Sequence, residues 1–438
     1  MKAKININTR FDSFQKYSLY QSLDRESRNE IKDIGIEYKL TFQELKQLTD
    51  MAVDFKMWEE PGIGIQWKLY SKSLNQSNKI FNKTVLKSIK NHWQTLKEDE
   101  TKYETKSKRN YKSTVRKIKE INGENEVFGM CPVASEKTVC CNLRTIDVAQ
   151  GCGLGCSYCS IQTFYEDGAI AVEKNLEDKL ASIKLDPNKN YHIGSGQSSD
   201  SLALGNKNGI LDAQLDFASN NPNIILEFKT KSKNINHFLN VKMPNNVFIS
   251  WSLNPQLFID NEEARTASLK QRLKSARTLS DKGILVGFHF HPLVHYQGWE
   301  KDYKKLIGNL MDMFSPNEIG LISFGTLTFI KPAIKSLRQI GTKSKILQIP
   351  FEEAAGKISY PMETKKKIFS EVWDSFTPWH DKVFFYFCME DKELWNHVFG
   401  KCYKSNDDFE TDLFDSVKRK LELNDPVSYT HLTLPTKA

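Results

Sequence analysis

The sequence lacks any uninterrupted apolar run long enough to cross a membrane. Its first residues, MKAKININTRFDSF, alternate polar and apolar side chains and lack the apolar core of a secretory signal. Hydrophobic residues make up 39% of the chain and charged residues 26%, so the composition is that of an ordinary globular protein. We therefore expect a soluble, cytoplasmic protein with no membrane partner.

Disulfide staples are not expected either, because the thiols of cytosolic proteins stay reduced. Eight cysteines are nevertheless present, and five of them lie between residues 140 and 159. Such a local concentration in a chain of 438 residues favours metal ligation or catalysis.

The charge is not strongly one-sided, and the net value of +8 is a modest excess that suits an anionic partner such as nucleic acid. The most basic stretch is 101–120, where Tyr103 and Tyr111 lie among basic side chains and only two glutamates. The basic residues are Lys102, Lys106, Lys108, Arg109, Lys112, Arg116, Lys117 and Lys119. This pattern is typical either of a solvated helix face or linker, or of a contact with nucleic-acid phosphates. Both interpretations stay open.

The first third of the chain carries a clear helix signal. A T-x-x-E capping box at Thr41 and Glu44 precedes apolar residues at helical spacing. This pattern predicts an amphipathic helix over residues 41–60, ended by Pro61.

After Cys141, short apolar or β-branched runs alternate with helical patterns, which is typical of βαβ units in a parallel sheet. We expect strands at residues 143–148, 191–194, 224–230, 247–252, 284–290, 318–324 and 346–349. The clearest helix is expected at 262–282, with Gly283 as its stop and one apolar face. That face consists of Leu269, Leu273, Ala276 and Leu279.

These patterns predict an α/β fold in four segments. Residues 1–138 are expected to form a mainly helical, basic N-terminal extension, and residues 139–352 a TIM-like partial barrel of the (β/α)6 type. Residues 353–424 would form a small C-terminal α+β region. Residues 425–438 show neither helical period nor strand pattern and look like a non-native tail.

Cys152, Cys156 and Cys159 form a CxxxCxxC loop shortly after the first expected strand, where barrel enzymes carry their active sites. Three thiolates can hold a [4Fe-4S] cluster and leave one iron open. An open iron can bind S-adenosylmethionine, whose reductive cleavage gives a 5′-deoxyadenosyl radical. Structural zinc is the alternative, but it takes four ligands, and no fourth is evident nearby. The loop therefore predicts a radical S-adenosylmethionine (radical SAM) enzyme.

The remaining cysteines allow two interpretations. Cys131, Cys140 and Cys141 could hold an auxiliary cluster, but buried structural thiols are favoured, because adjacent residues of a strand point in opposite directions. Cys388 and Cys402 are solitary and lie among aromatic residues, which is typical of a core, although either could donate a hydrogen atom.

Three histidines, His289, His291 and His295, lie at the end of an expected strand. The first two share one face of that strand by its period of two. A metal site is one interpretation, because imidazole is a common ligand. Hydrogen-bonded polar lining of the barrel mouth is favoured, with substrate contact possible at His291.

Seven segments, taken in order, resemble the spore photoproduct lyase family over about residues 141–360. They are CGLGCSYCSIQ, IGSGQSSDSLAL, LEFKTKS, SWSLNP, the stretch from QRL to GFHFHP, YQGWEKDY and FIKPA. That family splits a thymine dimer lesion in DNA. The resemblance implies a radical SAM partial barrel, a [4Fe-4S] cluster on the three loop cysteines, and S-adenosylmethionine as the cofactor.

The resemblance also assigns roles to individual residues. The cofactor would be contacted by Gly194, Ser195, Gly196, Lys231, Ser252 and Asn254. Hydrogen-bond donors and bare backbone at such positions suit a polar cofactor. The catalytic positions would be Tyr158, Gln197 and Asp200.

The sequence departs from the family at three positions. Gln197 stands where the lyases have a cysteine that gives a hydrogen atom to the product radical, and an amide N–H is too strong a bond to do so. Ser160 stands where the lyases have a second tyrosine beside the third cluster cysteine, although Tyr158 is kept. Thr328 replaces an arginine that precedes the F-x-K-P segment.

The expected activity is hydrogen abstraction from a nucleic-acid lesion, as in carbon–carbon lyase repair of DNA. A different radical reaction on another substrate is slightly favoured by the departures. A non-enzymatic iron–sulfur module that binds nucleic acid is the third possibility, and the long βα-repeating body argues against it. The expected partners are DNA or a nucleotide-like substrate, and a reduced flavodoxin or ferredoxin-type electron donor.

Overall fold

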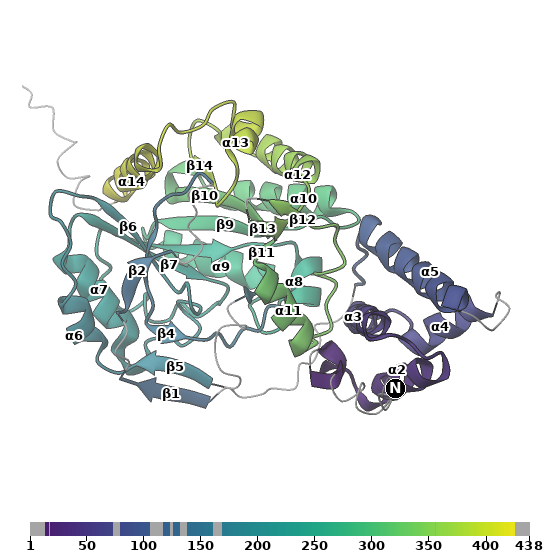
Figure 1. Cartoon of the computed structure of the whole chain (residues 1–438). Helices are drawn as coiled ribbons and strands as arrows, with labels where there is room; N and C mark the ends of the chain where they lie inside the picture. The colour runs from purple at the N-terminus through teal and green to yellow at the C-terminus, as the bar shows by residue number, and fades with distance from the viewer. Residues whose placement is uncertain are drawn as a thin grey trace, which may run out of the picture. The chain divides into compact units, whose positions relative to one another are not determined.

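The computed structural model describes residues 14–16, 18–72, 79–105, 117–122, 126–131, 138–160, 169–354 and 356–424. The chain separates into two compact units, whose elements are labelled in Figure 1. One unit consists of residues 1–103 and 328–358, and the other of residues 104–327 and 359–438. The four segments expected from the sequence stay a prediction.

The first unit is mainly helical. Its helices are η1 (Leu19–Ser22), α2 (Arg25–Glu37), α3 (Phe42–Trp58), α4 (Ile63–Ser71), α5 (Lys79–Glu98) and α11 (Lys331–Ile340). The predicted capping box starts α3: the Thr41 hydroxyl accepts the Glu44 N–H at 3.3 Å, and the Glu44 carboxylate accepts the Thr41 N–H at 2.8 Å. The helix ends at Glu59, whose φ of 63° is left-handed. The helix predicted before Pro61 is therefore confirmed.

The second unit is built on an eight-stranded sheet with the order β14-β10-β9-β8-β7-β6-β3-β2. These strands are β2 (Phe128–Met130), β3 (Arg144–Ile146), β6 (Tyr191–Ser195), β7 (Ile224–Thr230), β8 (Val247–Ser252), β9 (Val286–Leu293), β10 (Ile319–Thr326) and β14 (Phe384–Phe387). All neighbours from β14 to β3 pair in parallel, and only β2 is antiparallel. Parallel neighbours require crossover connections, which the helices supply.

Those helices pack along the sheet, as Figure 1 shows for α14 beside β10 and β14. They are α6 (Leu176–Ala181), η3 (Lys207–Gly209), α7 (Ile210–Asn220), α8 (Gln256–Glu262), α9 (Leu269–Ser280), α10 (Trp299–Met313), η4 (Pro316–Glu318), α12 (Met362–Ser375), η5 (Thr377–Trp379), α13 (Lys392–Phe399) and α14 (Asn406–Leu423). Two small sheets have the orders β1-β5-β4 and β11-β13-β12. Their strands are β1 (Lys117–Ile121), β4 (Ala149–Gln150), β5 (Ala169–Glu173), β11 (Thr328–Phe329), β12 (Glu352–Ala354) and β13 (Lys357–Ser359).

The two ends of the large sheet are tied together. Val139, shortly before β3, forms a bridge with Glu390, shortly after β14, and its N–H donates to the Glu390 carbonyl at 3.1 Å. The sheet is therefore curled, and the predicted α/β fold with a TIM-like partial barrel is confirmed.

Six of the seven expected strands coincide with β3, β6, β7, β8, β9 and β10. The seventh, at residues 346–349, is wrong: these residues form turns, with the Gln348 N–H donating to the Lys345 carbonyl at 2.9 Å. Ile346, Leu347 and Ile349 are buried, so the apolar run marks burial and not extended backbone. The last sheet strand is instead the aromatic β14, whose role the sequence pattern did not reveal.

The helix expected at residues 262–282 begins later than predicted. Helix α9 starts at Leu269, after a capping box in which the Ser268 hydroxyl accepts the Gln271 N–H at 3.3 Å. The preceding α8 ends at Glu262, which leaves residues 263–268 outside both helices. This non-helical segment becomes central to the site.

Several expectations fall outside the described ranges, including Lys106, Lys108, Arg109 and Lys112 of the basic stretch and the tail at 425–438. Lys117 and Lys119 of that stretch lie in β1 and are exposed. In the part of the chain that the structure describes, no helix is long and apolar enough to cross a membrane.

Candidate functional site

The cysteine loop follows β4 directly. Cys156 is buried, whereas Cys152 and Cys159 are half-buried. The loop turns tightly: the Cys159 N–H donates to the Cys156 carbonyl at 3.1 Å, and the Leu154 N–H lies 3.5 Å from the Cys152 sulfur. Burial raises the pKa of Cys156 well above its usual range, and the charge of Glu263 adds to this shift, whereas the charge of Lys231 opposes it.

The loop is docked onto the segment between α8 and α9. Cys156 forms an antiparallel bridge with Glu263, and the Ser157 N–H donates to the Glu262 carbonyl at 2.9 Å. Arg265 holds the other side of the loop by hydrogen bonds: its backbone N–H donates to the Leu154 carbonyl at 3.0 Å. Its Nε donates to the Gly153 carbonyl at 2.5 Å. Three residues that the sequence pattern predicted to lie inside one helix, Glu262, Glu263 and Arg265, thus hold the loop by its backbone.

Gly155 is the loop glycine at which a side chain would collide with Arg265. Its φ is +65°, and a Cβ there would lie 2.9 Å from the Arg265 guanidinium. Only glycine adopts this conformation readily and also leaves room for the arginine.

The Glu263 carboxylate is the shared partner of the polar side chains around the cysteine loop. Its Oε1 accepts a hydrogen bond from the Tyr158 hydroxyl at 2.5 Å, and its Oε2 accepts one from Arg272. The Lys231 ammonium lies 3.8 Å from Oε1, and the Asn254 amide donates at 3.4 Å. Burial would raise the pKa of Glu263, but the charges of Arg272 and Lys231 outweigh it and lower the pKa to about 2. The group is therefore a carboxylate at neutral pH.

Tyr158 is fixed on three sides. Its ring stacks on Phe258 with centroids 5.6 Å apart, and the Lys231 ammonium lies 5.9 Å from the ring centroid. Burial and the charge of Glu263 raise the pKa of Tyr158 well above its usual range. It is a neutral phenol that donates its proton to a fixed acceptor.

Lys231 lies one residue beyond β7, at the carboxyl end of the sheet. Its ammonium donates to the His291 carbonyl at 3.2 Å, besides its pairing with Glu263. Burial lowers the pKa of Lys231, although Glu263 opposes that shift. Ser252 is the last residue of β8, and its backbone carbonyl accepts a hydrogen bond from the Arg272 guanidinium at 2.8 Å. Asn254 follows two residues later, and its side-chain amide oxygen accepts a hydrogen bond from the Tyr303 hydroxyl at 2.8 Å.

Gly194, Ser195 and Gly196 form the end of β6 and the first residue after it. Gly196 has a φ of +82°, and a Cβ there would lie 2.8 Å from the Ser201 backbone nitrogen. The Ser195 hydroxyl is buried and has no hydrogen-bond partner in the described part of the chain. A buried polar atom without a partner is costly, so this hydroxyl is suited to a ligand. Gln197 follows and is half-buried.

Asp200 is buried and fully engaged as an acceptor. One oxygen accepts the Leu202 and Ala203 N–H groups and the Thr230 hydroxyl, at 3.1, 2.9 and 2.7 Å. The other accepts the Lys231 N–H at 2.7 Å. Burial raises the pKa of Asp200, although these donors oppose it. Asp200 therefore fastens the loop after β6 to the end of β7, which positions Lys231.

The structure thus brings most of the expected residues together. Tyr158, Lys231 and Asn254 meet at Glu263 beside the cysteine loop, and Asp200 links Lys231 to the loop that carries Gly196. Sequence reasoning missed Glu263 and Arg272. The signal available was the polar run NEEART, which was absorbed into a helix prediction although it interrupts the apolar period.

The histidines and the remaining cysteines lie elsewhere in this unit. His289 and His291 both hydrogen-bond Ser323, so they do share a face, whereas the His295 ring contacts Trp299 at a centroid distance of 5.8 Å. Cys140 is buried and Cys141 is half-buried, and a hydrogen bond with Cys140, together with desolvation, raises the pKa of the Cys141 thiol.

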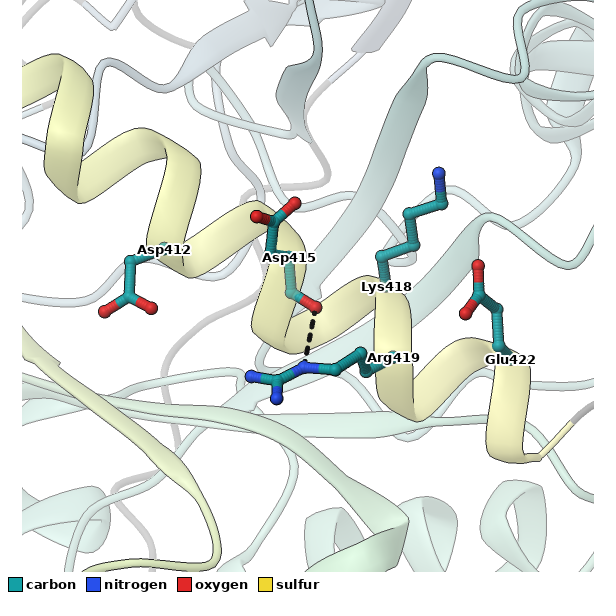
Figure 2. A pocket seen from close by; sticks show the side chains of 5 residues that line it. All are labelled: Asp412, Asp415, Lys418, Arg419 and Glu422. Carbon is teal, nitrogen blue, oxygen red and sulfur yellow. Dashed lines mark hydrogen bonds between the residues drawn. The ribbon is translucent and has the colours of Figure 1, made fainter.

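A shallow hollow on α14, shown in Figure 2, is not part of this site. It is lined by Asp412, Asp415, Lys418, Arg419 and Glu422, and Arg419 donates to the Asp415 carbonyl at 3.4 Å. Charges of both signs at helical spacing are typical of a solvated helix face.

The donor set fits an iron–sulfur cluster by its chemistry. Three thiols on one short, anchored loop are what a cluster with an open iron requires. Among the described residues, no three or more His, Cys, Asp or Glu side chains are arranged as a formed metal site. The fit of the cluster therefore rests on the three loop thiols and on the anchorage of the loop.

The chain is similar to proteins of one known family. The model of the spore photoproduct lyase family matches residues 135–365. Spore photoproduct lyase of Clostridium acetobutylicum is 27% identical over 180 residues, which are 40% of this chain and 53% of that protein. The protein of that name from a Geobacillus strain is 26% identical over 208 residues, 46% of this chain and 61% of that protein. The chain thus spans between half and two thirds of these relatives.

Solved structures show the same fold. A mutant spore photoproduct lyase with bound S-adenosylmethionine and dinucleoside spore photoproduct has a TM-score of 0.55 at 20% identity, covering 65% of this chain and 88% of that one. Another lyase, complexed with dinucleoside spore photoproduct, is 21% identical and covers 62% and 82%. The family match extends over more than half of the sequence and includes the cysteine loop, Glu263 and every residue described around them. The chain belongs to the spore photoproduct lyase family.

Proposed function

We propose that this protein is a radical SAM enzyme that acts on a nucleic-acid lesion, as a DNA-repair lyase of the spore photoproduct type. The observation that carries the proposal is the anchorage of the cysteine loop on residues 262–266, which brings Tyr158 and Lys231 to one buried carboxylate, Glu263.

Cys152, Cys156 and Cys159 would hold a [4Fe-4S] cluster. When bound, the cluster and S-adenosylmethionine supply a 5′-deoxyadenosyl radical that abstracts hydrogen from the substrate. The chain's own part is to fix the loop: Arg265 holds its backbone, and the bridge to Glu263 holds Cys156. A reduced flavodoxin or ferredoxin-type protein would be the electron donor.

The cofactor would lie across the carboxyl ends of β6, β7 and β8. The Ser195 hydroxyl would gain a partner there, and Gly196 would let the backbone approach closely. Lys231, Ser252 and Asn254 would contact its ribose region, with Lys231 oriented by Glu263 and by the Asp200 hydrogen bond to its N–H.

Tyr158 would occupy the substrate side as a neutral phenol whose hydroxyl is aimed at Glu263. Gln197 would contact the substrate without giving it a hydrogen atom, because an amide N–H is too strong a bond. The second candidate, a different radical reaction on another substrate, is favoured by this one residue. A non-enzymatic iron–sulfur module remains the alternative from another class.

The test is anaerobic reconstitution with iron and sulfide, followed by dithionite and S-adenosylmethionine. We expect 5′-deoxyadenosine from the wild type and none from Cys156→Ala. Equal yields from both proteins would contradict the enzyme proposal. Adding dinucleoside spore photoproduct then separates the two candidates, since the lyase should consume it and another radical enzyme should not.

A further inference from the structure

Four of the eight cysteines lie around the bridge between Val139 and Glu390 that joins the two ends of the large sheet. They come from three segments of the chain, and none of them is part of the cysteine loop. Each is buried or half-buried. We call them the seam cysteines: Cys131 after β2, Cys140 and Cys141 before β3, and Cys388 after β14.

The first two segments are brought together by the pairing of β2 with β3. Met130 lies opposite Arg144 in this antiparallel pair. The next residue, Cys131, donates its backbone N–H to the Leu143 carbonyl at 2.9 Å. Cys131 is therefore level with Leu143, which follows Cys141 by only two residues.

The third segment reaches the same place from the other end of the sheet. The Cys388 N–H donates to the Phe324 carbonyl at 2.8 Å, which fixes the backbone just after β14. Two residues further on, Glu390 forms its antiparallel bridge with Val139. Antiparallel segments run past each other, so the residue two places after Val139 approaches the residue two places before Glu390. These two residues are Cys141 and Cys388.

Cys140 and Cys141 can act together because they lie before β3 and outside any strand. The following residue, Asn142, has a left-handed φ of 51°, so the alternation of side chains along an extended strand does not apply here. A hydrogen bond with Cys140, together with desolvation, raises the pKa of the Cys141 thiol. The two thiols are therefore in contact. Sulfurs bound at about 2.3 Å to one tetrahedral zinc ion lie about 3.8 Å apart, which is a contact distance of the same kind.

The start of α14 anchors the backbone of this cysteine pair. The Cys140 N–H donates to the Asn406 side-chain oxygen at 3.0 Å. The Asn142 amide donates to Asp407 at 3.0 Å and to Glu410 at 3.1 Å. These bonds use backbone and neighbouring side chains, and they leave the position of the pair fixed. A metal site needs ligands on such anchored backbone.

The charges around Cys388 favour a cation at the seam cysteines. Burial raises the pKa of the Cys388 thiol to about 12, and Cys131 and Cys140 are among the groups that add to this shift. The charge of Lys229, in β7, opposes it. A divalent cation acts in the same direction as Lys229 and more strongly, because a thiol that binds a metal is deprotonated.

We propose that the four seam cysteines bind one zinc ion in a tetrahedral site of four thiolates, which joins the two ends of the large sheet. Four thiolates complete the coordination of zinc and leave no open position, which is typical of a structural site. The four sulfurs are not arranged as a formed metal site among the described residues, so side-chain rotation must bring them onto the ion. The site is separate from the cysteine loop and does not depend on the proposed function.

The first test measures metal in the full chain by mass spectrometry after dialysis against a chelator. It uses a loop variant, in which alanine replaces the three cysteines of the loop, so that zinc on the loop cannot be counted. We expect about one zinc ion per chain. Adding Cys388→Ser should weaken zinc binding by more than about a hundredfold, since loss of a ligand exceeds the effect of losing its outer partners. Adding Cys402→Ser instead should leave zinc binding unchanged, because Cys402 is not a seam cysteine.

The second test does not depend on how well the Cys388→Ser variant folds. Cobalt(II) is substituted for zinc in the loop variant. We expect the visible absorption of tetrahedral cobalt and an intense near-ultraviolet charge-transfer band from the thiolates. Wild type loaded with its iron–sulfur cluster should likewise carry about one zinc ion per chain beside the iron.

A loop variant without zinc would overturn the inference, and so would Cys388→Ser that binds zinc as tightly as the Cys402→Ser control. A cobalt spectrum without the charge-transfer band would exclude thiolate ligands. Iron and sulfide in the loop variant in place of zinc would show a cluster at the seam cysteines and overturn the assignment of zinc. The deoxyadenosine assay of the wild type decides the proposed function separately from all these outcomes.

Discussion

The Tyr158 hydroxyl donates a 2.5 Å hydrogen bond to Glu263 Oε1, and the two residues lie 105 positions apart in the chain. Their neighbours Ser157 and Glu262 are joined by a backbone bond, and Cys156 is bridged to Glu263. The cysteine loop is thus held by a segment that the chain reaches only after three further strands of the large sheet, β6, β7 and β8.

Neutralising Glu263 should destabilise the protein more than a single hydrogen bond would. Glu263→Gln leaves the fully buried Arg272 without its counter-charge, for which we expect a loss of about 3–5 kcal/mol in the free energy of unfolding. Denaturant titration of the apoprotein measures it. Glu262→Gln is the matched control, since this adjacent buried carboxylate bonds the Ser157 hydroxyl and should cost only about 1–3 kcal/mol. Equal losses from Glu263→Gln and Glu262→Gln would show that the ion pair between Glu263 and Arg272 adds no stability beyond a single hydrogen bond.

Glu263 should also make the free energy of unfolding depend on pH. Its pKa is lowered to about 2 in the folded state, so its contribution is complete above the ordinary value of 4.5 and is lost as the pH falls towards 2. Between pH 5 and pH 3, the stability gap between wild type and Glu263→Gln should therefore narrow, by about 2 kcal/mol. A gap that stays constant over this range would mean that folding does not change the pKa of Glu263.

A methyl group at Gly196 should be poorly tolerated. Its φ of +82° disfavours alanine, and the added Cβ would lie 2.5 Å from the Ser201 hydroxyl oxygen. We expect Gly196→Ala to lower the free energy of unfolding by about 1–3 kcal/mol. Gly308→Ala provides the opposite case: Gly308 is inside α10 with nothing near its would-be Cβ, so alanine should stabilise by about 0.5–1 kcal/mol. Urea denaturation of both variants measures the two changes in the free energy of unfolding, which should have opposite signs.

Removing the Ser195 hydroxyl should separate folding from cofactor binding. The hydroxyl is buried without a described partner, so Ser195→Ala should leave the apoprotein as stable as the wild type or slightly more so. Its affinity for S-adenosylmethionine, measured by equilibrium dialysis on the cluster-loaded protein, should fall by about tenfold. Unchanged affinity would place the cofactor elsewhere.

Much of the fold could be predicted from the sequence, because burial periodicity and end signals are local. The capping box at Thr41 and Glu44 starts a helix as expected, and six apolar runs become neighbouring strands. The prediction failed at residues 346–349 and at residues 263–268, where apolar content or a continuing pattern was mistaken for regular backbone. In both places the physical cause is tertiary: burial in the first, and the demands of the cysteine loop in the second.

By itself, the sequence determined the chemistry that the chain can carry: three thiols at CxxxCxxC spacing, the family match around them, and a glutamine at position 197, where the resemblance to the lyases implies a donor thiol. Only the tertiary structure decided which groups form ion pairs and hydrogen bonds with one another. Glu263 becomes the partner of Tyr158, Lys231 and Arg272, and Glu227 becomes the partner of His192 and His289. The reason is physical: a hydrogen bond or buried ion pair depends on separation in space, and these partners come from different strands and loops of one curled sheet.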